Sequence, residues 1–170
     1  PMDSIDGCTP QLAVEQGLQR LAARRGEKHS TLPTNMAILG LATFPLPDAV
    51  LRVLDIDPQQ GVAAGVLYET EPNGYILADN WLRQRAQSLI SNRTQCEDAL
   101  ADALMRASVQ PSKWANIARH MIHGRNPHRA LAPAIHAAVY ATQMGRFNEA
   151  RSWLMAIDPM KRDPKDSTYR

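Results

Sequence analysis

Four histidines in the second half of the sequence have a type and spacing that could hold a metal ion. His120 and His123 are three positions apart, so on a helix they would share one face and could bind one ion together. A closed zinc site needs further ligands, and neither a carboxylate nor a cysteine lies between residues 103 and 148. We therefore favour ordinary packing or surface histidines, with no metal, for the whole set: His120, His123, His128 and His136.

The same stretch of sequence concentrates positive charge. Because residues 103–148 contain no acid, an arginine-rich face there could contact the phosphates of a nucleic acid. An acidic protein surface would use such a patch equally well. A third interpretation is a solvated face balanced by acids elsewhere, such as Asp55, Asp57, Glu69 and Glu71. The candidate basic patch consists of six residues: Arg106, Lys113, Arg119, Arg125, Arg129 and Arg146.

Catalytic motifs are missing from the sequence. It contains no glycine-rich phosphate loop, no nucleophile elbow and no His-Glu-x-x-His helix. Asp55 and Asp57 could form an acid pair, but both lie at a predicted helix end before Pro58, where capping and turn roles are typical. We therefore expect a protein that is not an enzyme and that uses no cofactor.

The composition indicates the scaffold that positions these residues. The 170 residues are 44% hydrophobic and 21% charged, but only 5% are aromatic, and Ala and Leu recur throughout. This balance favours close-packed helices, because strands are enriched in aromatic and β-branched residues. We predict an all-α protein of one domain or a short repeat array. The net charge of +2 is too small to indicate nucleic-acid binding by itself.

The expected location is cytoplasmic. No window approaches 18 unbroken apolar residues, so no membrane span is predicted. The first residues lack the basic and apolar runs of a secretory signal. Two cysteines fit a reducing compartment at least as well as an oxidising one.

Proline and glycine residues divide the chain into short helices. We expect a partly ordered N-terminal segment over residues 1–34, with a helix over 10–25, a helical-hairpin domain over 35–159, and a frayed tail over 160–170. No pair of strands is expected, although Gly61–Tyr68 could be a buried strand instead of a helix. Three further helices are predicted before residue 91: from Met36 to before Pro45, from Pro47 to before Pro58, and over Tyr75–Ile90. Four are predicted after it: from Asn92 or Thr94 to before Pro111, from a Ser112 cap to Gly124, over Leu131–Met144, and over Arg146–Ile157.

Two segments of the chain resemble each other. Pro45–Pro58 and Arg146–Pro159 are both single predicted helices that end in an apolar residue followed by Asp-Pro, and their closing prolines are 101 residues apart. Three tetratricopeptide periods of about 34 residues would give nearly the same spacing. The spacing suggests a stacked array of helical hairpins.

The C-terminal hairpin resembles a tetratricopeptide unit over about 30 residues. Small, glycine, aromatic, alanine and large apolar residues occupy the matching positions: Ala138, Gly145, Phe147, Ala150 and Leu154. The two alanines would let the helices pack closely, and Gly145 would supply the turn. Phe147 and Leu154 would fill the space against a neighbouring unit.

The residues Pro133–Ala150 are also similar to the last repeat of the translocator chaperones of bacterial type III secretion systems. His136-Ala137-Ala138 and Glu149-Ala150 carry this likeness. The resemblance implies a virulence-associated chaperone that keeps an exported protein soluble, and it is compatible with a homodimer. The first helix of each hairpin would then line a concave binding surface, and on the final unit the exposed positions are predicted to be Ala132, Ile135, Val139 and Thr142.

A regulatory DNA-binding domain is the alternative function, and it would use the basic stretch over residues 106–146. Salt dependence separates the two hypotheses, because contacts with phosphates weaken steeply as the salt concentration rises. A protein partner is the first expectation and nucleic acid the second.

Overall fold

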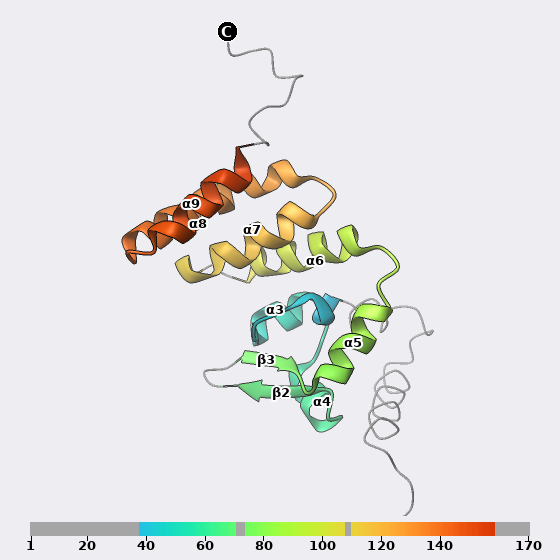
Figure 1. Cartoon of the computed structure of the whole chain (residues 1–170). Coiled ribbons are helices and arrows are strands. Elements are labelled where there is room, and N and C mark those ends of the chain that lie inside the picture. Colours follow the sequence, from blue (N-terminus) through green and yellow to red (C-terminus); the bar gives the residue numbers. More distant parts are fainter. Residues whose placement is uncertain (1–37, 71–73, 108–109, 159–170) are drawn as a thin grey trace, which may run out of the picture. The chain divides into compact units, whose positions relative to one another are not determined.

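The structure is a computed structural model that describes residues 38–70, 74–107 and 110–158. It divides into two compact units, Pro1–Ser91 and Asn92–Arg170, and is mainly helical with one small sheet (Figure 1). The segments expected over 1–34 and 160–170, including the helix over 10–25, lie outside the described residues. Within the described residues no helix is long and apolar enough to cross a membrane.

The first unit combines short helices with a three-stranded antiparallel sheet. Strand β3 lies between the other two strands, with Tyr75 opposite Leu46 on one side and Gly74 opposite Thr70 on the other. Residues 38–41 are also helical. The elements in chain order are β1 (Leu46–Pro47), α3 (Asp48–Val53), α4 (Pro58–Ala63), β2 (Leu67–Thr70), β3 (Gly74–Leu77) and α5 (Asn80–Ser88).

The sheet corrects the prediction that no pair of strands forms. The segment Gly61–Tyr68 is divided between α4 and β2, and Tyr75–Ile90 is divided between β3 and α5. Asn73-Gly74 is a strong hairpin signal, and the residues that follow it are aromatic and aliphatic, as strands prefer. This local turn chemistry outweighs the weak helical spacing of the apolar residues. The class is therefore mainly α with a small sheet.

The two alternating aspartates of the first unit have local structural roles, as the sequence predicts. The side chain of Asp57 accepts hydrogen bonds from the backbone N–H groups of Gln59 and Gln60 and so caps α4. Asp55 lies in the turn after α3 with a φ of 58°, a region that Asp tolerates better than most residues.

In the part of the chain that the structure describes, the second unit has four α-helices and two short 3₁₀ segments. Each α-helix packs against the next, α6 on α7, α7 on α8 and α8 on α9 (Figure 1). Their bounds agree with the predicted helices to within a few residues. The elements are α6 (Arg93–Arg106), η1 (Pro111–Lys113), α7 (Trp114–His123), η2 (Pro127–Ala130), α8 (Leu131–Gln143) and α9 (Phe147–Ile157).

The helix ends of the second unit confirm two predictions and correct two. Asn92 caps α6 by accepting a hydrogen bond from the N–H of Gln95, and Gly145 has a φ of 72° in the turn between α8 and α9. Ser112 lies inside η1 and does not cap α7, because Pro111 starts a 3₁₀ turn there. Gly124 has an extended backbone instead of the left-handed conformation expected of a glycine after a helix.

Small residues bring α8 and α9 close together. Ala138 and Ala141 of α8 form a buried cluster with Ala150 of α9, and Trp153 packs against it. A second cluster joins Ala134 to Ile157 and to Ala118 of α7. The close approach at Ala138 and Ala150, which the sequence predicts, is present. Because alanines occupy the contact with α9, the larger aliphatic side chains of α8 (Leu131, Ile135 and Val139) lie on its exposed side.

Candidate functional site

Helix α8 exposes an apolar stripe. Leu131, Ile135 and Val139 are spaced by four residues, so they lie on one side of the helix. Their exposed fractions are 36%, 41% and 50%. Ala132 and Thr142 are exposed as well. The four predicted binding residues, Ala132, Ile135, Val139 and Thr142, therefore all reach the surface on the same helix.

Two ring contacts also involve helix α8. His136 stacks on Trp114, with ring centroids 4.7 Å apart and an interplanar angle of 23°. The guanidinium of Arg146 lies 5.6 Å from the ring centre of Tyr140, a cation–π distance. Helix α8 itself contains no Asp, Glu, Lys or Arg. Covering its exposed face would therefore desolvate no ionised side chain of the helix.

Helix α9 also exposes large apolar side chains. Phe147 is 67% exposed, Leu154 49% and Met155 64%. The tetratricopeptide resemblance implies that Phe147 and Leu154 fill a space against a neighbouring unit. In the described part of the chain both side chains face solvent, so α9 offers a second apolar surface.

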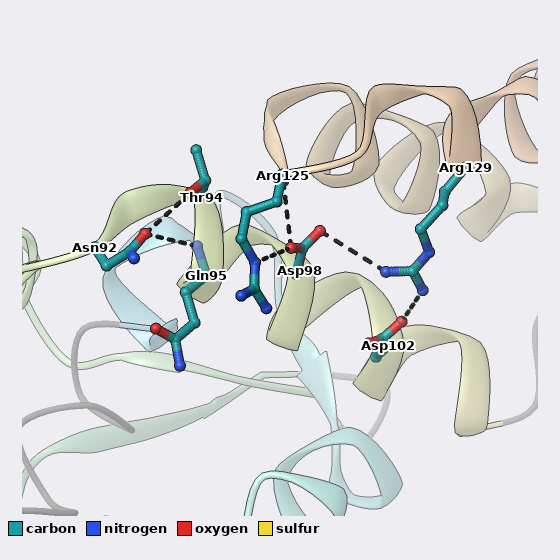
Figure 2. Close-up of polar contacts among 7 residues, drawn as sticks. All are labelled: Asn92, Thr94, Gln95, Asp98, Asp102, Arg125 and Arg129. Carbon is teal, nitrogen blue, oxygen red and sulfur yellow. Dashed lines mark hydrogen bonds and ion pairs between the residues drawn. The ribbon is translucent and has the colours of Figure 1, made fainter.

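The candidate basic patch is closely paired with acids (Figure 2). The Oδ2 of Asp98 accepts hydrogen bonds from the backbone N and the Nε of Arg125, at 3.2 and 3.1 Å. Arg129 lies 3.8 Å from the Oδ1 of Asp98 and also pairs with Asp102. Two of the six predicted cations thus meet at acids of α6 (Figure 2).

The remaining cations of the predicted patch are spread over several elements. Arg146 pairs with Glu149 at 2.8 Å. Arg106 ends α6, Lys113 ends η1 and Arg119 lies on α7. The six predicted residues therefore do not form one unopposed positive surface, since Arg125, Arg129 and Arg146 have acidic partners.

A buried hydrogen-bonded pair lies between α6 and α7. The Nδ1 of His120 is 2.6 Å from the Oε2 of Glu97, and the two residues are 4% and 2% exposed. Arg93 donates to the other carboxylate oxygen at 3.3 Å. Burial alone would raise the pKa of Glu97, but the hydrogen bonds and charges of His120 and Arg93 outweigh it and lower this pKa.

The histidines do not act as a group. His120 is buried against Glu97, whereas His123, His128 and His136 are exposed. Among the described residues no set of three or more His, Cys, Asp or Glu side chains could hold a metal ion. His120 is a buried residue that contacts Glu97 between α6 and α7.

Sequence reasoning missed the acids that hold α6 against the following elements. Glu97, Asp98 and Asp102 come just before the acid-free stretch, and Asp98 and Asp102 are four residues apart, on one side of a helix. That spacing is the signal that could have identified them as partners of the arginines. The acids were assigned instead to a more distant part of the sequence.

Comparisons with protein families, with characterised proteins and with solved structures produce no match to this chain. The function must therefore be inferred from the chain's own residues. In the second unit, buried polar residues lie between α6 and α7, and exposed apolar residues lie on α8 and α9.

Proposed function

We propose that this chain is a non-enzymatic protein-binding module with tetratricopeptide-like stacked hairpins, and that its α8 face shields an apolar segment of an exported protein. The observation that carries the proposal is the exposed stripe of Leu131, Ile135 and Val139 on a helix without ionised side chains. A secretion chaperone needs such a surface, because it must cover apolar residues of its cargo and later release them.

The energetics fit reversible binding. Covering three half-exposed aliphatic side chains contributes about 1 kcal/mol each, and the matching apolar residues of the cargo add a similar amount. Association costs several kcal/mol of translational and rotational freedom. The balance favours a moderate affinity, which suits a chaperone that hands its cargo on.

A protein partner is supported better than DNA. Three of the six predicted phosphate-binding residues, Arg125, Arg129 and Arg146, form ion pairs with carboxylates of the same unit. A phosphate would have to compete with those acids. The DNA-binding alternative predicts a gel shift that is lost steeply between 50 and 200 mM salt, a range in which strong phosphate binders lose about a thousandfold in affinity or more.

The test is co-expression with an exported protein encoded beside the gene of this chain, followed by size-exclusion chromatography with light scattering. Ile135→Asp should abolish the complex, since it places a charge in the middle of the stripe. Val53→Asp is the matched control, because Val53 has the same exposed fraction of 41% but lies in the first unit. Loss of the complex in both variants, or in neither, would rule out the α8 face as the binding surface.

A further inference from the structure

Helix α8 has one residue that can change its charge near neutral pH. Its sequence contains His136 but no Asp, Glu, Lys or Arg. Histidine is the side chain that ordinarily gains or loses a proton between about pH 5 and 8. The charge of the proposed binding helix is therefore set by a single imidazole.

His136 lies on the exposed side of α8, next to the apolar stripe. It is four residues after Ala132 and three before Val139, so the three side chains are neighbours on the helix surface, and all three are exposed. Its ring stacks on Trp114, the first residue of α7, with centroids 4.7 Å apart. A partner that covers Ala132 and Val139 therefore covers the outer part of this imidazole as well.

Among the described residues no acid pairs with His136. Helix α8 packs against η1, α7, η2 and α9. The acids of these elements are Glu149, which pairs with Arg146, and Asp158 at the end of α9, and neither makes a hydrogen bond or an ion pair with His136. The other charged or titratable residues of these elements are basic: Lys113, Arg119, His120, His123, His128, Arg129 and Arg151.

Protonation of His136 changes the cost of covering it. A neutral imidazole loses its water at the modest cost of one polar group, whereas an unpaired charge is far more expensive to bury. The apolar segment proposed as cargo supplies no carboxylate either. The stack on Trp114 would become a cation–π contact, but it is present with and without cargo and does not replace the lost water. Protonation therefore weakens the complex.

We infer, on the basis of the function proposed above, that the α8 face holds its cargo while His136 is neutral and releases it when His136 gains a proton. A fall in pH would then dissociate the complex without a change in the fold. Because a single proton is involved, the affinity should fall by about tenfold between pH 7.5 and 5.5.

Fluorescence anisotropy with an uncharged probe measures this pH dependence. The probe is an amphipathic helical peptide of Leu, Ala and Gln with blocked ends and an uncharged dye, so that only the protein can bind protons. The wild-type chain should bind it about tenfold more weakly at pH 5.5 than at pH 7.5. Circular dichroism at both pH values verifies that every protein is folded.

Substitutions at position 136 separate the effect of charge from that of shape. His136→Phe keeps a ring beside Trp114 but cannot be protonated, so its affinity should change by less than about twofold between the two pH values. His136→Lys is charged at both and should bind at pH 7.5 about as weakly as the wild type does at pH 5.5. His123→Gln is the matched control, because His123 is an exposed histidine of α7, and it should keep the pH response of the wild type.

Three results would overturn the regulation and leave α8 as the binding surface. They are wild-type binding that does not weaken at pH 5.5, a pH response that persists in His136→Phe, and a His136→Lys variant that binds like the wild type at pH 7.5. Ile135→Asp reports on the surface itself. If the wild type fails to bind the probe at pH 7.5, or if Ile135→Asp binds it equally well, the proposed function fails and the regulation fails with it.

Discussion

Helices α6 and α7 bury a polar contact in addition to their apolar residues, whereas the buried cluster between α8 and α9 consists of alanines. In the first interface Glu97 and His120 are buried together, and Asp98 binds the turn that follows α7. In the second interface Ala138 and Ala150 pack in one cluster. A buried charged pair is stabilising only when its geometry is good. The difference indicates that Glu97 and His120 fix α6 against α7, whereas α8 and α9 pack through small residues and leave their larger apolar side chains exposed.

The largest expected effect comes from removing the buried carboxylate of the polar interface. Glu97→Ala leaves His120 and Arg93 without their shared partner, which should lower the free energy of unfolding by about 3 kcal/mol. Glu149→Ala removes an exposed partner of Arg146 beside α9 and should cost less than about 1 kcal/mol. Urea unfolding followed by circular dichroism measures both. Equal losses would remove the distinction between the two interfaces.

Substituting either of two turn glycines, Gly124 or Gly145, should destabilise the protein, but for different reasons. A Cβ at position 124 would overlap the Oδ1 of Asp98, so Gly124→Ala should displace this carboxylate from Arg125 and cost about 2 kcal/mol. At position 145 an added Cβ meets no atom, and the cost of about 1 kcal/mol comes from the φ of 72° alone.

Asparagine distinguishes these two causes, because it tolerates the left-handed region better than alanine does. Gly145→Asn should recover part of the stability that Gly145→Ala loses. Gly124→Asn should recover none, since the steric conflict with Asp98 remains. Thermal melts of the four variants measure the differences, and recovery at position 124 would show that the polar interface adapts more easily than the geometry indicates.

Acid should weaken the polar interface before the alanine interface. Since the pKa of Glu97 is lowered from its ordinary value of 4.5 in the folded protein, the folded state binds fewer protons there than the unfolded state. The stabilisation is complete well above pH 4.5 and is lost as the pH falls through the lowered pKa. Unfolding measured between pH 6 and 3 should show a steeper loss in the wild type than in Glu97→Gln. Identical slopes would contradict this role of the pair.

The smallest effect on stability is expected on the exposed stripe of α8. Val139→Asp should change the free energy of unfolding by less than about 0.5 kcal/mol, because the side chain is half exposed and makes few core contacts. Ala141, on the buried side of the same helix, provides the contrast: Ala141→Leu should cost about 2 kcal/mol by overpacking. Urea unfolding of both variants checks the assignment of the two sides.

The sequence predicts the helical half of the molecule well and the sheet poorly. Periodic apolar residues and the glycine at 145 are local signals, and the hairpin of α8 and α9 follows from them. Strands β2 and β3 are close in sequence, and the Asn73-Gly74 signal could have indicated their pairing, but the apolar residues on either side also fit a helical spacing. The exposure of Ile135 and Val139 was predictable from the hairpin. The partnership of Asp98 with Arg125 joins residues 27 positions apart, so only the spacing of Asp98 and Asp102 on one side of a helix could have indicated it.

The most direct test of the proposed α8 binding surface is an NMR titration of the ¹⁵N-labelled chain with an apolar segment of the proposed exported partner. The largest amide shift changes should fall on Leu131–Thr142 of α8, while the amides around Asp98 and Arg125 should change little. Largest changes at the α6–α7 interface, or no change at saturating peptide, would contradict the assignment of α8 as the binding surface.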